Sequence, residues 1–239
     1  MKIYEQKFKI FLSDIGSSNS IMPTGILKML QEIGGLHSSV FGLGLNDFPK
    51  TGFAWIVLNW KIKFFKFPCW NTTLDIKTWS RGNNGLYWFR DYEIYDNDEL
   101  VALASSKWVL YDSLKNTIVR VKENSIKFDP YDRRVFNSDF AKLKEPNFYD
   151  STFEYTVLRK DIDTNHHVNN INYLYLALEA LPIDVYNKNI SEIDIMYKHS
   201  ARLGDKIICK YKKISDNEHI VTMKSKDDSL LYSIVRLKY

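Results

Sequence analysis

The ten residues from Asp161 to Asn170 read DIDTNHHVNN and concentrate carboxylate, amide and imidazole groups in one short stretch. Asp163, Asn165 and His167 alternate, so on an extended segment their side chains would project to the same side. Such a set can supply a general base, an orienting group and a polarising group. We therefore predict that these three residues form a catalytic site.

The residues that follow this stretch predict a helix. Apolar residues at 3-4-3 spacing share one face, and Pro182 should end the helix. The spaced residues are Ile171, Leu174, Leu178 and Leu181. Asn169 or Asn170 is the expected N-cap. The backbone N–H groups of Val168, Asn169 and Asn170 would lie at the positive start of the helix, where they can hold a developing oxyanion.

A metal site fits the same stretch poorly. Asp161, Asp163 and Asn165 occupy the first, third and fifth places of a calcium loop, but His166 and Asn172 replace its glycine and its glutamate. A zinc site would need a third ligand at helical spacing from the two histidines. We expect neither a metal nor another cofactor.

The chain repeats one order of elements. A shift of 147 residues places FLSDI, residues 11–15, over LRKDI, residues 158–162, and it places GILKMLQE over NYLYLALE. After each helical run, β-forming residues alternate with turn-like clusters, over residues 53–111 in the first copy and 190–239 in the second. Each copy therefore predicts a short strand, a loop, one helix and an antiparallel meander.

We expect two tandem domains of the α+β class. The N-terminal domain spans residues 1–125, a linker of mixed charge spans 126–150, and the C-terminal domain spans 151–239. One helix cannot cover both faces of a parallel sheet, so an antiparallel sheet wrapped around a central helix is the simplest arrangement. Under the 147-residue shift, the three predicted catalytic residues fall on Gly16, Ser18 and Ser20. We therefore predict a single active site, in the C-terminal domain.

The composition is that of a globular protein, with 239 residues, 45% of them hydrophobic, and a net charge of +4. The pattern shows no run of about 18 apolar residues and no secretory signal, so we expect a cytoplasmic protein with no membrane partner. The mild charge and the lack of a helix-turn-helix pattern argue against a nucleic-acid partner. The positive excess could favour an acidic partner, and lysines that could steer one recur in the second copy, although solvated strand faces are their simpler explanation. These lysines are Lys198, Lys206, Lys210, Lys212 and Lys213.

The stretch DTNHHVNN followed by NYLYLALEALP resembles the signature of the acyl-ACP thioesterase family. The resemblance covers the repeat, the linker and the motif, and it implies two tandem hotdog domains. It also implies hydrolysis of a fatty acyl thioester on acyl carrier protein in fatty acid biosynthesis, with release of the free fatty acid. It places Asp163, Asn165 and His167 at the family's catalytic positions.

One position departs from the family pattern. An acidic residue commonly follows a Tyr-basic-basic string in the next strand, whereas Tyr197, Lys198 and His199 lead here to Ser200. Either this acidic residue is dispensable here, or Ser200, His199 or Glu179 near the end of the helix takes a supporting role.

Two mechanisms fit the three catalytic candidates. His167 can activate a water that attacks the carbonyl, with Asp163 supporting the imidazolium and Asn165 stabilising the oxyanion. A carboxylate nucleophile that forms an anhydride is the competing route. Hydrolysis of acyl-CoA and non-catalytic acyl binding are the alternative functions. The expected partner is acyl carrier protein, and the chain would be a monomer or a homodimer.

We expect the first domain to hold the acyl chain. All six tryptophans lie in it, and strands bearing Trp55, Trp60 and Trp79 should flank its helix. The apolar wall around the chain would come from one face of the helix and one tryptophan. These wall residues are Ile26, Met29, Leu30, Ile33 and Trp55.

Overall fold

The computed structural model describes residues 2–120, 129–138 and 140–239. It divides into two compact units, Met1–Asp139 and Phe140–Tyr239. The division falls inside the expected linker of residues 126–150. Residues 126–128 and 139 of that linker, and the expected domain boundary at residue 125, lie outside the described residues.

Each unit contains one main helix and a set of strands, with short helices between them. The elements of the first unit are β1 (Tyr4–Lys9), η1 (Leu12–Asp14), α1 (Pro23–Ser39), η2 (Leu45–Asp47), α2 (Phe48–Thr51), β2 (Phe53–Phe64), β3 (Thr73–Asn83), β4 (Trp88–Asp96), β5 (Glu99–Asp112) and β6 (Thr117–Val119). Those of the second unit are β7 (Ser151–Thr156), η3 (Arg159–Asp161), α3 (Asn170–Glu179), α4 (Ile183–Tyr186), β8 (Glu192–Tyr197), β9 (Lys206–Ser215), β10 (Glu218–Ser225) and β11 (Leu231–Lys238).

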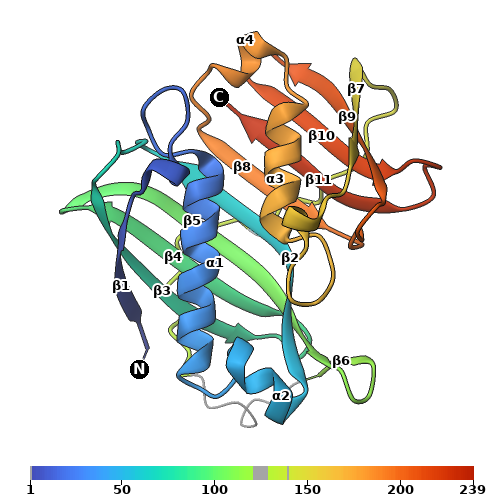
Figure 1. Cartoon of the computed structure of the whole chain (residues 1–239). Helices are drawn as coiled ribbons and strands as arrows, with labels where there is room; N and C mark the ends of the chain where they lie inside the picture. The colour runs from blue at the N-terminus through green and yellow to red at the C-terminus, as the bar shows by residue number, and fades with distance from the viewer. Residues whose placement is uncertain (1, 121–128, 139) are drawn as a thin grey trace. The chain divides into compact units, whose positions relative to one another are not determined.

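The first unit is an antiparallel sheet with α1 packed on one face. Its strands follow the order β1-β3-β4-β5-β2, and β6 pairs with β5. Along β3, buried Leu74 and Ile76 alternate with the partly exposed Asp75 and Lys77, which is the pattern of a strand with one covered face. Figure 1 shows α1 lying lengthwise across this sheet.

The second unit repeats this sheet. Its order, β8-β11-β10-β9-β7, is antiparallel throughout and matches β2-β5-β4-β3-β1 strand for strand. Helix α3 packs on β10 and β11 (Figure 1), and Leu174 and Ala177 on it are fully buried. Both units are therefore hotdog folds of the α+β class, as the sequence predicts.

The predicted shift of 147 residues holds for the start of both units. It relates β1 to β7, η1 to η3, and the first residue of α1, Pro23, to the first residue of α3, Asn170. The helices then differ in length, because α1 has 17 residues and α3 has 10. The internal repeat is confirmed element by element up to the helices.

Helix α1 lies close to its sheet because Gly34 has no side chain. A Cβ at this position would stand 3.1 Å from the Tyr92 hydroxyl of β4. Further along the helix, buried His37 contacts Arg90, whose Nη1 lies 2.6 Å from His37 Nδ1 and 3.3 Å from Thr78 Oγ1. Burial lowers the pKa of Arg90 below its usual value. The apolar face of α1 thus ends in a polar contact with β3 and β4.

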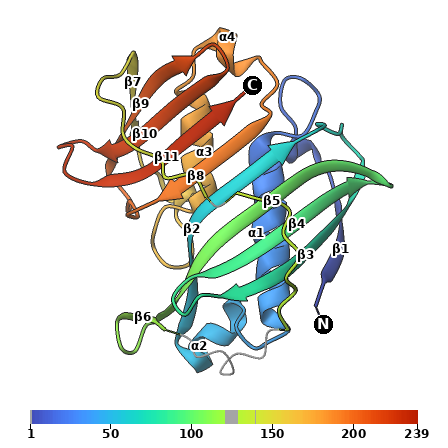
Figure 2. The same cartoon turned by 180° about the vertical axis from the view of Figure 1, so that it is seen from behind.

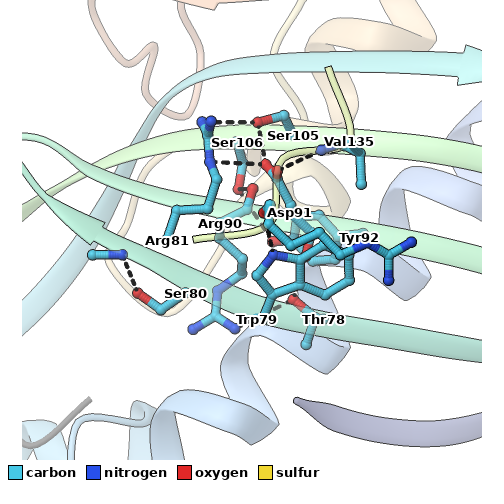
Figure 3. Close-up of polar contacts among 12 residues, drawn as sticks. Thr78, Trp79, Ser80, Arg81, Arg90, Asp91, Tyr92, Ser105, Ser106 and Val135 are labelled. Atoms are coloured by element: carbon cyan, nitrogen blue, oxygen red, sulfur yellow. Dashed lines mark hydrogen bonds and ion pairs between the residues drawn. The ribbon is translucent and has the colours of Figure 1, made fainter. Parts of the chain in front are cut away.

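Residues 129–138 of the linker pack on the sheet face opposite α1. Figure 2 shows this segment running over that face. Its anchor is Asp91, which accepts hydrogen bonds from Ser105 Oγ at 2.6 Å and the Val135 N–H at 3.0 Å, and pairs with Arg81 at 3.2 Å (Figure 3). Burial outweighs these contacts and raises the pKa of Asp91. The described linker residues are therefore part of the packed first unit.

The Trp79 side chain also lies on this outer face. Its Nε1 donates to the Arg133 carbonyl at 2.8 Å, and its ring packs against Tyr131 with centroids 6.0 Å apart. Strand β3, which bears Trp79, flanks α1 as expected. The Trp79 side chain itself points away from the helix, because it alternates with Thr78, which contacts Arg90 on the α1 side. Trp60 is fully buried, and the centroid of its ring lies 5.3 Å from that of the Tyr92 ring.

Within the described residues, no helix is both long enough and apolar enough to cross a lipid bilayer.

Candidate active site

The predicted catalytic residues lie on a tight loop between η3 and α3. Ile162 forms an antiparallel bridge with Val168, and the Asp163 N–H donates to the His167 carbonyl at 2.8 Å. His166 takes a left-handed conformation, with φ of 60°, to reverse the chain. The expectation of an extended segment is wrong, because the bridge forces the residues between its two ends to turn. Residues 162–168 are called the site loop below.

The Asp163 carboxylate holds the site loop in shape. Its Oδ1 accepts hydrogen bonds from the N–H groups of Asn165 at 2.8 Å and His167 at 3.2 Å. This side-chain turn is the local alternative to a backbone turn that aspartate favours. Asn165 is exposed, and Asp163 and His167 are partly exposed. The structure thus brings the three residues onto one loop, with the backbone fixing one oxygen of the carboxylate.

Asp161 has a different role, as a buried support under the site loop. Its Oδ2 accepts from the Leu158 N–H and from the Tyr155 hydroxyl, both at 2.8 Å. Burial and then the neighbouring Asp161 carboxylate raise the pKa of Tyr155 to about 12. The Asp161 carbonyl accepts from the Asn169 N–H at 2.8 Å and from Asn172 Nδ2 at 3.0 Å. Asp161 therefore ties η3, the site loop and α3 together.

The start of α3 bears out the predicted cap. Asn169 is the N-cap, and its side-chain oxygen accepts from the Ile171 N–H at 3.1 Å. Two of the three expected oxyanion donors are already engaged: the Val168 N–H donates to the Ala201 carbonyl at 2.9 Å, and the Asn169 N–H donates to Asp161. That expectation is wrong for Val168 and Asn169. For the Asn170 N–H, the described residues provide no hydrogen-bond partner.

Two buried tyrosines, which were not among the predicted site residues, fix the surroundings of the site loop. The Tyr173 hydroxyl accepts from the Ala201 N–H at 2.9 Å, and the Tyr197 hydroxyl donates to the Asn170 carbonyl at 3.1 Å. Burial raises the pKa of both phenols. Ala201 is thus bound to both Val168 and Tyr173, and this places the exposed Ser200 beside the site loop. The signal in the sequence was a tyrosine on the apolar face of the helix, which needs a partner for its hydroxyl.

Glu179 is not brought into this group. It is the last residue of α3 and is exposed, whereas the site loop joins the other end of the helix. The helix rise separates the two ends by about 13 Å. In the described residues, no three His, Cys, Asp or Glu side chains cluster closely enough to hold a metal ion.

The first unit builds the same loop without the chemistry. Its Gly16 N–H donates to the Ser20 carbonyl at 3.1 Å, and Asn19 has φ of 58°, in the place of His166. Asp14 is buried and accepts from the Phe11 N–H at 3.0 Å, as Asp161 does from Leu158. Its helix begins at Pro23, which has no N–H where Asn170 has one. Both units therefore form the loop, and the first unit forms it without the catalytic candidates, so the fold does not require them.

The expected wall for an acyl chain lies in the core of the first unit. Ile26, Leu30 and Ile33 are fully buried, and Met29 is 5% exposed. Trp55 is partly buried and lies edge-on to Trp88, with centroids 5.5 Å apart. It belongs to a cluster formed with the residues that follow α1, Phe41 and Leu43.

Curated proteins similar to this chain are longer than it is. The chain is 26% identical over 223 residues to the oleoyl-acyl carrier protein thioesterase, chloroplastic, of Coriandrum sativum. This match covers 84% of this chain and 60% of that protein. It is 28% identical over 205 residues to the palmitoyl-acyl carrier protein thioesterase, chloroplastic, of Arabidopsis thaliana, which covers 78% of this chain and 49% of that protein. The chain thus spans between about half and three fifths of their length.

Solved structures share the whole fold. An acyl-ACP thioesterase from Bacteroides thetaiotaomicron matches with a TM-score of 0.87 and 20% identity, over 99% of this chain and 97% of that one. The 12:0-ACP thioesterase from Umbellularia californica matches with a TM-score of 0.83 and 16% identity, over 99% and 93%. Residues 1–128 match the acyl-ACP thioesterase N-terminal domain, and residues 145–231 match the acyl-ACP thioesterase C-terminal domain. Since these two matches cover most of the sequence, the chain belongs to the acyl-ACP thioesterase family.

Proposed function

We propose that the protein hydrolyses fatty acyl thioesters carried by an acyl carrier protein, releasing the free fatty acid and the carrier protein thiol. The observation that carries this proposal is the site loop, which both units build and only the second equips with a carboxylate, an amide and an imidazole. Family membership supports the reaction class. The relatives that are named oleoyl- and palmitoyl-acyl carrier protein thioesterases support the substrate class.

In the proposed mechanism, His167 is the general base. It takes a proton from a water that attacks the thioester carbonyl, and Asp163 stabilises the resulting imidazolium. Asp163 is suited to this because two backbone N–H groups fix its carboxylate. The Asn165 amide and the Asn170 N–H stabilise the oxyanion. When the tetrahedral intermediate collapses, the C–S bond breaks and the imidazolium returns its proton to the leaving thiolate.

The two units would divide the work. Residues 151–239 form the proposed catalytic domain, and the first unit holds the acyl chain against Ile26, Met29, Leu30 and Ile33, with Trp55 beyond the end of α1. Ser200 is the proposed supporting residue, because its neighbour Ala201 is tied to the site loop. A cytoplasmic location stays a prediction from the sequence.

Steady-state hydrolysis of a series of acyl carrier protein substrates tests the proposal. For His167→Ala we expect kcat to fall by about 10²- to 10⁴-fold, because the proton transfer is lost. The matched control is His166→Asn, which puts at φ of 60° the residue type that the first unit has at 58°. This control should keep the wild-type kcat.

Two results would overturn parts of the proposal. Equal kcat for wild type and His167→Ala would remove His167 from the mechanism. Equal kcat/KM for acyl-ACP and acyl-CoA of the same chain length at low salt would instead support a coenzyme A thioesterase.

A further inference from the structure

Two segments border the site loop in the second unit and are held side by side. Residues 157–160 precede the loop, and residues 198–205 cross beside it. The Val157 N–H donates to the Asp205 carbonyl at 2.9 Å, and the Gly204 N–H donates to the Val157 carbonyl at 3.1 Å. Ala201 then binds Val168 at the end of the loop. The exposed side chains of these two segments therefore lie near the site loop.

These exposed side chains are basic or apolar, and we call the set the collar. It consists of Leu158, Arg159, Lys160, Lys198, Arg202 and Leu203, all of them exposed. In the part of the second unit that the structure describes, none of its four cations takes part in an ion pair. The nearby carboxylates of Asp163 and Asp205 accept hydrogen bonds from backbone N–H groups.

The lysines of β9 differ from the collar, because each faces a carboxylate. The four pairs are Lys206 with Glu154 at 2.7 Å, Lys210 with Asp228 at 2.6 Å, Lys212 with Asp150 at 2.8 Å, and Lys213 with Asp216 at 2.6 Å. Of the five lysines that the sequence analysis singled out, these four have compensated charges. Lys198, the fifth, belongs to the collar. Positive charge without an ion-pair partner thus gathers beside the site loop, rather than along β9.

The first unit shows that the fold does not require these cations. Three backbone hydrogen bonds recur in the two units. In the first unit the N–H groups of Ile10, Asn71 and Ile21 donate to the carbonyls of Thr72, Ile10 and Pro68. In the second unit the N–H groups of Val157, Gly204 and Val168 donate, in the same order, to the carbonyls of Asp205, Val157 and Ala201. On this correspondence, Arg159 and Lys160 match Leu12 and Ser13, and Lys198 and Arg202 match Phe65 and Cys69. All four cations are replaced by uncharged residues, so they accompany the catalytic candidates and not the architecture.

We propose that the collar is the docking surface for an acidic face of the carrier protein that delivers the acyl thioester. The inference rests on the proposed function and adds the place where the partner binds. Four exposed cations would steer and orient an acidic partner, since complementary charge at an interface acts mainly on the association rate and its salt dependence. Leu158 and Leu203, which are 47% and 56% exposed, would supply apolar contacts between the charges.

Charge reversal at the collar tests this. For Arg159→Glu/Lys160→Glu we expect kcat/KM for acyl-ACP at low salt to fall by about 10- to 100-fold, with a weaker dependence on salt. The same variant is assayed on the carrier-free acyl pantetheine thioester, and the ratio of the two kcat/KM values should fall. Lys198→Glu/Arg202→Glu reverses the other side of the collar and should lower the same ratio.

The matched control is Lys142→Glu/Lys144→Glu. These two lysines are exposed, lie in the second unit and also make no ion pair with the described residues. They flank Leu143, which packs on Ile220 and Ile234 of the sheet. The net charge changes equally in this control, so it should keep the wild-type ratio.

Other outcomes would contradict either the docking role of the collar or the proposed function, and the assays distinguish the two. An equal loss in control and collar variants would assign the effect to net charge. An equal loss on carrier-bound and carrier-free substrates would show that the collar residues support the loop and not the carrier. If wild type hydrolyses neither substrate, the proposed function fails, and binding of the carrier protein measured by fluorescence anisotropy still decides the collar. Unchanged binding in both collar variants would then overturn it.

Discussion

Aspartates two residues apart, Asp161 and Asp163, have separate roles because they meet different environments. Asp161 is 6% exposed and holds together η3, the loop and the helix start, and Asp14 does the same in the first unit. Asp163 is partly exposed and has no acidic counterpart, since Gly16 takes its place. A buried carboxylate that satisfies backbone N–H groups is structural in both copies. The carboxylate that only one copy carries is the candidate for chemistry.

His219 couples the stability of the second unit to pH. It is fully buried, its Nδ1 lies 2.8 Å from the Tyr211 hydroxyl, and its ring is edge-on to Tyr239. Burial, and then the charge of Lys188, lower the pKa of His219. In the unfolded chain this histidine titrates near its ordinary pKa of about 6.5. Between that value and the lowered native pKa the unfolded state binds more protons, so stability should fall as the pH falls.

We expect His219→Asn to flatten this pH dependence. Asparagine can still bond to Tyr211 but takes up no proton, so the free energy of unfolding should change less between about pH 7 and pH 5. Urea unfolding at both pH values measures the change. His166→Asn, an exposed site, should keep the wild-type slope. An identical slope for His219→Asn and wild type would show that other groups set the acid sensitivity.

At the scale of elements, the first turns of α1 and α3 contact the carbonyl of the preceding buried aspartate in two different ways. In the first unit Gly25 lies against the Asp14 carbonyl, and a Cβ there would come within 3.1 Å of that oxygen and 2.9 Å of Ile21 Cγ1. In the second unit Asn172 occupies the matching place and donates its side-chain N–H to the Asp161 carbonyl at 3.0 Å. Close backbone approach in one copy is thus replaced by a hydrogen bond in the other.

Alanine at two glycines of α1 separates packing from helix propensity. Gly25→Ala should be less stable than Gly35→Ala by about 1–3 kcal/mol, because the new methyl group at Gly25 overpacks against a backbone carbonyl. Gly35 is exposed and a Cβ there meets no atom within 4 Å. Alanine has the higher helix propensity, by about 1 kcal/mol in a helix interior, so a Gly25→Ala protein that is less stable than wild type would report the packing cost. Chemical denaturation measures both, and equal stability would mean that the first turn of α1 relaxes freely.

At the scale of the whole molecule, the two units share one fold but differ in their functional residues and in their core aromatic residues. Both units share five antiparallel strands in the same order with one main helix, and the first unit adds β6 beside β5. The second unit carries the site loop residues and the collar, whereas the first carries all six tryptophans and the longer helix. If the second unit alone performs the proposed chemistry, the core of the first unit can differ from it, and this is the basis for proposing that the first unit binds the acyl chain.

Enlarging a residue of the proposed wall tests this division. We expect Met29→Trp to shift the preference toward shorter acyl chains, because added volume on the buried face of α1 takes space from the end of a long chain. Met29→Leu, which nearly conserves volume, should keep the wild-type preference. Competition between acyl-ACPs of different length measures the shift, and binding of a long substrate by His167→Ala should change tryptophan emission. An unaltered profile together with unaltered emission would place the acyl chain elsewhere.

The sequence by itself determined the features that depend on neighbours along the chain. The repeat, the helix after DIDTNHHVNN, an asparagine cap at 169 or 170 and the restriction of the polar set to one copy follow from local spacing and comparison of the two halves. Only the tertiary structure decided which polar groups are available. The N–H of Val168 meets the carbonyl of Ala201, and the lysine at 206 meets Glu154. Such contacts join residues that are 33 and 52 positions apart in the sequence. Whether a donor or a charge is free therefore depends on what a distant segment places beside it.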